Sequence, residues 1–588
     1  MKENHKTAEI ADSCELSGAK IVIQALLDQG VEHVFGYPGG SVLPIFDEIY
    51  QQNKVRHILV RHEQAAGHAA EGYARTTGKV GVFLVTSGPG ATNAVTPLQD
   101  ALMDSIPVVC IAGQVSTALI GSDAFQEADT ISITRSCTKH NWLVRNVNDL
   151  SDVIHKAFFV ASSGRPGPVL IDIPKDIQLS TAIYLSKKSM DSMSYGSLVQ
   201  NVNLHAVNQA VDLLVQAHKP IIYSGGGVIT SGLKAVRFLR ELVKIGNFPI
   251  TSTLMGLGAY PANSANWLGM LGMHGTYEAN MAMHDCDVML AVGARFDDRI
   301  TGRLDAFAPD AKIIHIDIDP LSFNKNVRVD IPILGDVADI LDKMVSQLLL
   351  LYSRVEKVDL NLWWKEITRW RARNSLAYQK KGDVIMPQYA IERLWALTKD
   401  YAPYLTTEVG QHQMWTAQFF GFDEPNHWMT SGGLGTMGYG FPAAIGVQIA
   451  RPNDLVICVA GDASIQMNIQ ELSTAIQHDA RVKVFILNNQ YMGMVRQWQE
   501  LLYGNRLSHS YMEAIPDFVK LAEAYGAVGI QCSRPDDLDS CICEMVACKK
   551  PVLLDCRVVN LVNCLPMIPS GSAHNEMLLQ DEIIVADG

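Results

Sequence analysis

Residues 454–462 read DLVICVAGD, and residues 482–490 read VKVFILNNQ. Each stretch is a short apolar run that ends in polar side chains, as expected for a buried strand of a parallel sheet. Asn489 follows Asp462 by 27 residues, which suits one strand–helix–strand crossover. We therefore expect two neighbouring parallel strands that present the Asp462 carboxylate and the Asn488–Asn489 amides at one sheet edge, where open α/β sheets bind ligands.

The same alternation of strand-like runs and helical stretches continues outward over the chain. Further runs are 80–88 (VGVFLVTSG), 106–113 (IPVVCIAG), 220–227 (PIIYSGGG) and 287–296 (DVMLAVGARF). This alternation predicts an α/β protein with three doubly wound parallel-sheet domains. We place the domains at residues 1–184, 204–353 and 382–556, with a closing carboxyl-terminal tail at 557–588. The polar stretch 184–203 and the charged, Trp-containing helix 363–381 are interpreted as linkers.

Composition and charge exclude several classes of protein. The chain has 588 residues, of which 48% are hydrophobic and 19% charged. It can therefore bury large cores and is not disordered, collagen-like or a coiled coil. The net charge of −13 argues against a surface for nucleic acid or anionic membranes. No apolar run reaches the roughly 18 residues of a membrane-spanning helix, and the first residues lack the apolar core of a secretory signal.

The cysteines are scattered, and several lie inside apolar strand-like runs, such as Cys110 and Cys458. This pattern is typical of reduced, buried thiols in a cytoplasmic protein. The one cluster in the sequence comprises Cys541, Cys543 and Cys548. Neither a His nor a second Cys pair lies nearby, so the pattern does not favour a metal site there.

The oxygen atoms at the predicted sheet edge suit a hard cation. Mg²⁺ prefers carboxylate and amide oxygens and completes its octahedron with diphosphate oxygens. The alternative is purely structural, with Asp462 capping a helix and Asn488–Asn489 forming a turn. Either half of the motif alone favours the structural alternative, whereas the pair at this spacing favours a site for Mg²⁺ and a diphosphate.

The pair also resembles the diphosphate-binding motif of thiamin diphosphate (ThDP) enzymes. Ala463 stands where that motif usually has Gly, and we expect it to be tolerated if its φ is negative. Ordered motifs over nearly the whole chain resemble the catalytic subunits of the acetolactate synthase (acetohydroxyacid synthase) family. They are 36–40 (GYPGG), 86–93 (TSGPGATN), 123–127 (DAFQE), 163–168 (SGRPGP), 270–275 (MLGMHG), 294–299 (ARFDDR), 432–438 (GGLGTMG) and 493–498 (GMVRQW).

The resemblance implies that the three domains bind, in chain order, the aminopyrimidine of ThDP, FAD, and the ThDP diphosphate with Mg²⁺. Glu63 would bond to the aminopyrimidine N1′ and drive its tautomer cycle; taken alone, a Glu in a first helical turn would only complement the helix dipole. Gly40 and Gln126 would lie near the reacting carbon and, with Glu63, are the implied catalytic residues. The other implied ThDP contacts are Gly410, Gln411, His412, Gly435, Met437, Asp462 and Asn489, and the implied metal ligands are Asp462, Asn489 and Tyr491.

The resemblance also implies sites for FAD, which takes no net part in the redox balance, and for substrate. The positions that match FAD contacts are Arg165, His274, Arg295, Asp317 and Asp336, and those that match substrate contacts are Phe125, Lys175, Met273, Arg299 and Trp498. From the residues alone, the glycines at 225–227 only weakly indicate a dinucleotide site. Arg299 would pair with the carboxylate of the second 2-oxo acid. Trp498 would favour 2-oxobutyrate as acceptor, unless it is an ordinary core Trp.

The implied activity is that of a transferase in valine, leucine and isoleucine biosynthesis. It would decarboxylate pyruvate and condense the hydroxyethyl unit with a second pyruvate or with 2-oxobutyrate, giving 2-acetolactate or 2-aceto-2-hydroxybutyrate. The resemblance further implies a homodimer or tetramer with active sites at the subunit interface and a small regulatory subunit. Neither nucleic acid nor membrane is an expected partner.

Two other functions remain open. A different ThDP–FAD enzyme would share the cofactor motifs, but glyoxylate carboligase lacks the glutamate that Glu63 supplies, and pyruvate oxidase lacks the Trp498 segment. A cofactor-free scaffold that binds a regulatory partner is suggested only by Ala463. The intact Asp462 and Asn489 oppose that alternative.

Overall fold

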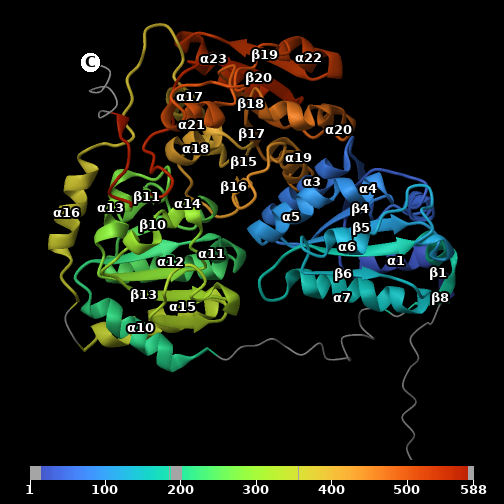
Figure 1. Cartoon of the computed structure of the whole chain (residues 1–588), viewed down its shortest axis with the longest axis horizontal. Helices are drawn as coiled ribbons and strands as arrows, with labels where there is room; N and C mark the ends of the chain where they lie inside the picture. The colour runs from blue at the N-terminus through green and yellow to red at the C-terminus, as the bar shows by residue number, and fades with distance from the viewer. Residues whose placement is uncertain (1–14, 185, 187–201, 355–356, 581–588) are drawn as a thin grey trace, which may run out of the picture. The chain divides into compact units, whose positions relative to one another are not determined.

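The computed structural model describes residues 15–184, 186, 202–354 and 357–580. The chain divides into two compact units, residues 1–198 and 199–588, and each is described by itself. One six-stranded parallel sheet lies in the first unit and two lie in the second (Figure 1). These three doubly wound sheets confirm the predicted fold class. No described helix is both long and apolar enough to cross a membrane. Of the linker expected at 184–203, residues 185 and 187–201 lie outside the described residues.

The sheet of the first unit has the strand order β3-β2-β4-β5-β7-β6. Its strands are β2 (His33–Gly36), β3 (Arg56–Leu59), β4 (Gly81–Val85), β5 (Val108–Gln114), β6 (His140–Leu143) and β7 (Val169–Pro174). The helices are α1 (Gly18–Asp28), α2 (Leu43–Tyr50), α3 (Glu63–Thr77), α4 (Pro89–Asn93), α5 (Val95–Asp104), α6 (Thr130–Thr134), α7 (Leu150–Ser162) and α8 (Lys175–Leu179). A small antiparallel sheet pairs β1 (Glu15–Ser17) with β8 (Thr181–Ile183). The winding direction reverses between β2 and β4, and such a switch point is where these folds bind ligands.

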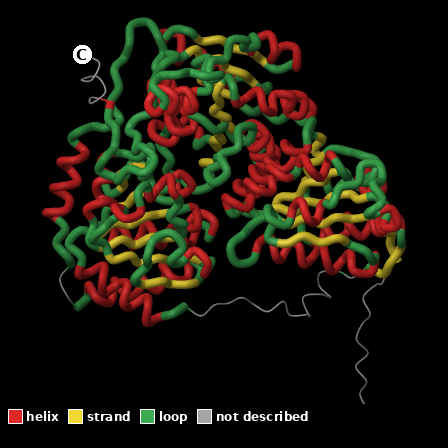
Figure 2. Tube along the Cα trace, in the orientation of Figure 1, coloured by secondary structure: helices red, strands yellow, loops and turns green. Residues whose placement is uncertain are grey.

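The first sheet of the second unit has the order β11-β10-β9-β12-β13-β14. Its strands are β9 (Pro220–Ser224), β10 (Ile250–Ser252), β11 (Trp267–Met270), β12 (Val288–Val292), β13 (Lys312–Asp317) and β14 (Ile331–Leu334). The helices are α10 (Leu204–Gln216), α11 (Gly226–Thr230), α12 (Leu233–Gly246), α13 (Tyr277–Asp285), α14 (Asp298–Thr301), α15 (Val337–Tyr352) and α16 (Asn361–Arg371). Alternate strand residues serve two cores, since Ile222 packs with α10, α12 and α15, and Ile221 packs with α13 and α16. Figure 2 shows these helices on both faces of the strands.

The linker interpretation of residues 363–381 was wrong for its first half. Residues 361–371 form α16, and Trp363 and Trp370 are buried in the core on the α13 face of this sheet. Their rings meet edge to face at 5.5 Å, and the Trp363 indole N–H donates to Pro220 O at 3.0 Å. The charged residues of α16 lie on its outer face, so the helix is amphipathic. Charge alone therefore misled the interpretation, whereas the apolar spacing of Trp363, Ile367 and Trp370 identifies a helix that packs on the sheet.

The last sheet has the order β16-β15-β17-β18-β20-β19. Its strands are β15 (Tyr404–Thr407), β16 (Trp428–Met429), β17 (Val456–Gly461), β18 (Lys483–Asn488), β19 (Val528–Cys532) and β20 (Val552–Arg557). The helices are α17 (Pro387–Thr398), α18 (Gln411–Phe419), α19 (Gly440–Ala450), α20 (Leu472–Gln477), α21 (Gly493–Leu502), α22 (Phe518–Tyr525) and α23 (Pro535–Ala547). The apolar cores on the two faces contain residues of α17, α18 and α23 on one side and of α19, α20 and α22 on the other. The winding direction reverses between β15 and β17.

After β20 the chain returns over the second unit as a tail without long helices or strands. Residues Cys564 and Met567 contact Gln497 on α21, and the Ile568 N–H donates to Met273 O at 2.8 Å. His574 is buried, and its Nε2 lies 2.6 Å from Ile300 O on α14. The tail thus contacts both α21, which follows β18 of the last sheet, and α14, which follows β12 of the other sheet of this unit.

Candidate active site

The ends of β17 and β18 place Asp462 and Asn489 side by side. The two strands are parallel neighbours, with Gly461 opposite Leu487. Both polar side chains are buried, and the Asn489 backbone N–H donates to Asp462 Oδ1 at 3.4 Å. The carboxylate and the amide that the sequence predicts at one sheet edge therefore meet there, next to the switch point between β15 and β17.

The two adjacent asparagines have different neighbours. The Asn488 amide nitrogen donates to Asp555 Oδ1 on β20 at 2.7 Å. Asn489 instead accepts the Tyr491 backbone N–H at 3.1 Å and directs its amide nitrogen toward Gln411 Oε1 at 3.4 Å. Asn489 and Tyr491 therefore lie with Asp462, as expected, whereas the amide nitrogen of Asn488 connects two strands.

Three buried polar atoms at this edge lack a hydrogen-bond partner within the described part of the chain: Asp462 Oδ2, His412 Nε2 and Asn488 Oδ1. Burial raises the pKa of Asp462 to about 7 and lowers the pKa of His412 to about 3. A divalent cation would stabilise the ionised carboxylate, and a neutral imidazole can donate one N–H to a phosphate oxygen. The donor set fits Mg²⁺ with a diphosphate.

Glycines make room for His412 beside the metal edge. A Cβ atom on Gly410 or Gly461 would come within 2.8 Å of the His412 ring. Gln411, the first residue of α18, donates to Gln497 Oε1 and to Val562 O, both at 2.8 Å. The three predicted diphosphate contacts, Gly410 to His412, thus lie together at the carboxyl end of β15.

Glu408, which the sequence analysis did not single out, holds the loop that contains Gly435 and Met437. Its carboxylate accepts the backbone N–H groups of Gly438 at 2.6 Å and Phe441 at 3.1 Å. Burial raises the pKa of Glu408 to about 7. Gly435 has a φ of 75°, and no atom would approach a Cβ there. The only sign of this role in the sequence is an acidic residue directly after the strand run LTT. A carboxylate that binds loop N–H groups has no recognisable motif in a single sequence.

Ala463 fits the turn in which a glycine was expected. Its φ is −79° and its ψ is −46°, which is ordinary right-handed backbone. The side chain is buried. The expectation that alanine is tolerated at a negative φ is therefore confirmed for the backbone conformation.

In the first unit, Glu63 begins α3 at the carboxyl edge of the sheet. Its Oε2 accepts the Asn93 side-chain N–H at 2.9 Å. The preceding glycine loop lies close by, because a Cβ on Gly39 would come within 2.4 Å of Thr86 and one on Gly90 within 2.8 Å of Thr86. Glu63 and the segments after β2 and β4 therefore gather at one switch point. Asn93 belongs to a motif in the sequence, but its bond to Glu63 was not predicted.

The other predicted residues of the first unit lie in loops at the same edge or at helix starts. A Cβ on Gly40 would meet no atom within 4 Å, so this backbone is open to a ligand. Gln126 has a φ of 60°, and its backbone packs against Gly88. Phe125 is 89% exposed, and Lys175 begins α8 directly after β7.

The residues matched to FAD lie in both units. In the second unit Arg295, Asp317 and Asp336 follow β12, β13 and β14 at one edge, and Gly225 approaches Gly293 across the β9–β12 switch point. Asp336 caps α15 by accepting the Ala338 N–H at 2.8 Å. Buried His274 lies 3.2 Å from Pro566 O through Nδ1, and burial lowers its pKa to about 4. In the first unit Arg165 Nε donates to Ser105 Oγ at 2.8 Å.

Three predicted substrate residues meet within the second unit. The Arg299 guanidinium lies over the Trp498 ring at 5.4 Å from its centroid, a cation–π arrangement. Arg299 Nη1 also lies 4.0 Å from Met273 Sδ, and the Met273 N–H donates to Arg299 O at 2.8 Å. Arg299 and its neighbour Asp298 are both exposed to solvent. The Arg299 guanidinium is therefore accessible and can donate hydrogen bonds to a ligand carboxylate.

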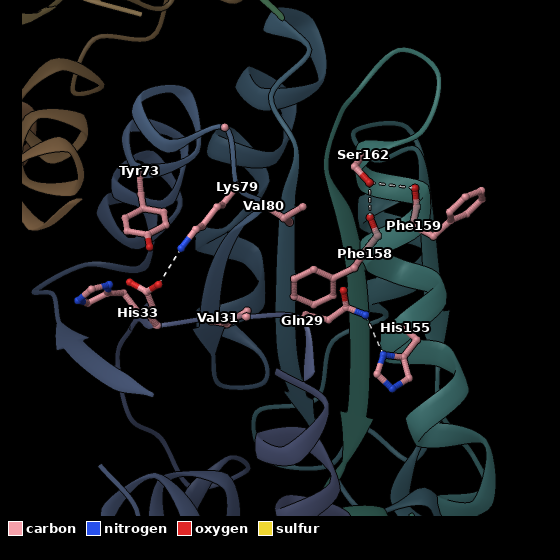
Figure 3. Close-up of a pocket in the computed structure, with 13 residues that line it drawn as sticks. Gln29, Val31, His33, Tyr73, Lys79, Val80, His155, Phe158, Phe159 and Ser162 are labelled. Atoms are coloured by element: carbon pink, nitrogen blue, oxygen red, sulfur yellow. Dashed lines mark hydrogen bonds and ion pairs between the residues drawn. The ribbon is translucent and has the colours of Figure 1, made fainter. Parts of the chain in front are cut away.

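A separate cavity of about 360 Å³ lies at the opposite, amino-terminal edge of the first sheet. Figure 3 shows His33, Tyr73 and Lys79 on one side of it and His155 and Phe158 on the other. It contains none of the predicted site residues. This cavity is therefore separate from the edge where the predicted residues of the first unit gather.

Comparison with known proteins identifies the family. Three domain models match: the Thiamine pyrophosphate enzyme N-terminal TPP binding domain at residues 16–133, the central domain at 207–344 and the C-terminal TPP binding domain at 408–556. The Acetolactate synthase isozyme 3 large subunit of Escherichia coli is 52% identical over 96% of this chain and 98% of its own length. The large subunits of Haemophilus influenzae and Pyropia yezoensis are 50% and 45% identical over 96% of this chain, and over 98% and 96% of their own lengths. The chain belongs to the acetolactate synthase large-subunit family.

The predicted residues can be assigned to the matched domains. Acetolactate synthases of this family are enzymes that use TPP, which is another name for ThDP, with Mg²⁺ and FAD. Glu63 lies in the part matched to the N-terminal TPP binding domain, and Asp462 and Asn489 lie in the part matched to the C-terminal one. Arg299 lies in the part matched to the central domain.

Proposed function

We propose that this chain is the catalytic large subunit of an acetolactate synthase that condenses two 2-oxo acids. It decarboxylates pyruvate and joins the two-carbon unit to a second pyruvate or to 2-oxobutyrate. The observation that carries the proposal is the cation–π pair of Arg299 and Trp498 in the same unit as the Asp462–Asn489 edge. One site then offers a cation for a carboxylate next to an apolar wall, which suits a 2-oxo acid with a short alkyl chain.

The residues of the metal edge hold the cofactor in this proposal. Bound TPP supplies a nucleophilic carbon and an electron sink for decarboxylation. Asp462, Asn489 and Tyr491 ligate Mg²⁺, and neutral His412 donates an N–H to the diphosphate. Gly435 and Met437 form the loop against which the cofactor rests, held by the bonds from Gly438 and Phe441 to Glu408.

Glu63 would hold the aminopyrimidine of the cofactor. Its carboxylate would share a proton with N1′ of that ring, and the bound ring would supply the base for the reacting carbon. The Asn93 amide donates to Oε2 and so leaves Oε1 for the ring. Gly40 and Gln126 line the space next to the reacting carbon, since the Gly40 backbone is open. Phe125 and Lys175 complete the substrate contacts from the first unit.

Acceptor selection belongs to Arg299, Trp498 and Met273. The guanidinium binds the acceptor carboxylate, and the Trp498 ring packs on its alkyl group. The extra methylene of 2-oxobutyrate gains contact with an apolar wall and contributes about 1–3 kcal/mol. This argument favours 2-oxobutyrate over a second pyruvate.

FAD occupies the central domain, with no net redox role. Arg295, Asp317 and Asp336 lie at the edge where the backbone around Gly225 and Gly293 packs too closely for a side chain on either, and an open α/β sheet binds a dinucleotide at such a switch point. His274 and Arg165 are further contacts. The proposed domains are 1–184, 204–353 and 382–556, with the closing tail at 557–588.

The proposed assembly is a homodimer or tetramer with active sites at the subunit interface, together with a small regulatory subunit. The term "large subunit" in the names of the relatives supports a smaller partner. The proposed location is the cytoplasm, where thiols such as the free Cys110 and Cys458 stay reduced.

Product analysis tests the proposal. The purified chain receives pyruvate, TPP, Mg²⁺ and FAD, with and without 2-oxobutyrate, and acetohydroxy acids, acetyl phosphate and oxygen uptake are measured. We expect 2-acetolactate, and mainly 2-aceto-2-hydroxybutyrate when both acids are present. Oxygen uptake with acetyl phosphate would instead assign a pyruvate oxidase.

Two variants assign the roles. Glu63→Gln should bind TPP but lose roughly 100-fold or more in turnover. Trp498→Leu should lower the ratio of acetohydroxybutyrate to acetolactate by about ten-fold while sparing acetolactate formation. An unchanged product ratio would remove Trp498 from acceptor selection.

A further inference from the structure

Three cysteines meet on one face of the last sheet. Cys532 ends β19, and Cys556 lies opposite it on the neighbouring strand β20. Cys541 on α23 packs against the apolar cluster that contains both. Cys532 and Cys556 are fully buried, whereas Cys541 is partly exposed and Cys543, two residues along the same helix, is exposed. The helix thus directs only one of these two cysteines toward the pair on the strands.

The three thiols interact with one another. Hydrogen bonds from Cys556 and from Cys541, against the opposing effect of burial, lower the pKa of Cys532 to about 7. Burial and the neighbouring Cys532 raise the pKa of Cys541. Cys532 Sγ also approaches Arg534 O at 3.6 Å, and Cys541 Sγ approaches Gln531 O at 4.0 Å. Of these thiols, Cys532 is therefore easier to ionise than Cys541.

The geometry argues against a preformed metal site at these thiols. Within the described chain, the one group of three His, Cys, Asp or Glu ligand atoms that all lie within 4.8 Å of each other is His68, Glu71 and Asp100. The three sulfurs do not form such a group, so Cys532 lies between two partners rather than at one corner of a ligand triangle. A pairwise bond is the chemistry that this arrangement favours.

We propose that Cys532 and Cys541 form a reversible disulfide when the protein meets a small-molecule disulfide such as oxidised glutathione. The position of the two residues supports this pair over Cys532 and Cys556, because Cys541 is the thiol that solvent reaches. Cys556 is buried in the sheet and held in register by both neighbouring strands. Cys532 lies on the edge strand β19, which β20 separates from β18, and the modification does not depend on the proposed function.

The reaction balances with the named oxidant. The Cys541 thiol loses its proton to solvent and attacks the small disulfide, so that one small thiolate leaves and a mixed disulfide forms on Cys541. Cys532 loses its proton to solvent and attacks the Cys541 sulfur, which releases the second small thiol. Two cysteine thiols are oxidised to one disulfide, and one small disulfide is reduced to two thiols.

Peptide mapping of the full-length chain tests the pair. The protein is incubated with oxidised glutathione, free thiols are blocked under denaturing conditions, and the chain is cut at Asp536, Asp537 and Asp539, which separates the two cysteines. We expect a cross-linked Cys532–Cys541 peptide pair, two hydrogens lighter than its parts, that dithiothreitol abolishes. Cys541→Ser should lose the cross-link, and the matched control Cys543→Ser on the same helix should keep it.

Three results would overturn the proposal. They are a stable glutathione adduct on Cys541 without any cross-link, a cross-link between Cys532 and Cys556, and modification confined to Cys543. Because the mapping uses the unaltered chain, these outcomes can be distinguished even where a cysteine variant fails to fold.

Discussion

Asn488 and Asn489 are a matched pair of side chains within one loop. Asn489 lies with Asp462 and Gln411, and the amide nitrogen of Asn488 donates to Asp555. We expect Asn489→Ala to weaken Mg²⁺-dependent TPP binding by ten-fold or more, since it removes an oxygen ligand. Asn488→Ala should leave the binding of Mg²⁺ nearly unchanged but cost about 1–3 kcal/mol of stability, because it leaves Asp555 Oδ1 buried without that donor.

Calorimetric titration of TPP at fixed Mg²⁺ and thermal unfolding of the same two variants separate these effects. Asn488→Ala is an informative control because Asn488 Oδ1 is also buried without a partner in the described residues, so this side chain too offers an oxygen. A large loss of affinity in Asn488→Ala with normal stability would show that both asparagines serve the metal.

At this scale the sequence predicted the meeting of Asp462 and Asn489 because parallel strands of known spacing must end at one edge. The strand pattern alone could not choose between Asn488 and Asn489, since the two side chains leave the end of a strand in different directions; the family resemblance was what selected Asn489 as a ligand. Sequence reasoning also missed Glu408 and the Asn93–Glu63 bond, which depend on how loops return to the sheet.

Among the helices, α3 and α5 are joined by a buried polar group close to the residues around Glu63. His68 Nδ1 lies 2.9 Å from Glu71 Oε1 and 3.9 Å from Asp100 Oδ2, and all three side chains are fully buried. Burial raises the pKa of Glu71 well above its usual value and lowers the pKa of His68 to about 4. Both shifts favour the uncharged forms, a protonated Glu71 and a neutral His68, and the contacts make the group a hydrogen-bonded brace between helices.

Protonated Glu71 has a consequence for stability that depends on pH. A carboxyl whose folded pKa is raised stabilises the fold below its unfolded pKa of about 4.3, and this contribution is lost as pH rises toward the folded pKa. Glu71→Gln mimics the protonated form, so its stability relative to wild type should improve by up to about 1.4 kcal/mol per pH unit above pH 5. Exposed Asp47→Asn on α2 is the control and should show no such slope.

Thermal unfolding of both variants between pH 5 and 8 measures the effect. A pH-independent difference between Glu71→Gln and wild type would mean that Glu71 is ionised in the folded protein. Sequence reasoning placed Glu63 in the first turn of a helix but gave no sign of this brace, because His68 and Asp100 meet only through the packing of two helices. The wrong linker interpretation of α16 has the opposite cause. There the apolar spacing that predicts a packed helix was present in the sequence, but the interpretation gave more weight to the charged residues.

At the scale of the second unit, the tail couples the two sheets. It supplies Ile568 to the Met273 backbone and His574 to Ile300, next to Arg299. We expect a chain that ends at residue 564 to raise the KM for 2-oxo acids several-fold while its affinity for TPP and Mg²⁺ changes little, because Val562, which binds Gln411, is retained. Steady-state kinetics and the same calorimetric titration measure the two quantities. Equal losses in both would mean that the tail supports the fold of the whole unit.

For the whole molecule, three sheets could be predicted from the alternation of strands and helices, but the arrangement of the two units could not, because no local pattern encodes it.

The proposed function requires Glu63, from the first unit, and Asp462, from the second, to act on one cofactor. If the active site lies at the interface between two copies, these residues come from different chains. Two inactive variants can then complement each other.

Mixed dimers of Glu63→Gln and Asp462→Asn decide this point. Each variant alone should be nearly inactive, whereas co-expression should restore up to about a quarter of wild-type activity, because about half of randomly paired dimers are mixed and each mixed dimer regains one intact site of two. The two variants carry different affinity tags, and the measured quantity is the activity per dimer. Variants that each alter the same unit, Asn489→Ala with Asp462→Asn, are the control and should not complement. Inactive mixed dimers would place Glu63 and Asp462 of one site in the same chain, and the interface would then serve stability rather than catalysis.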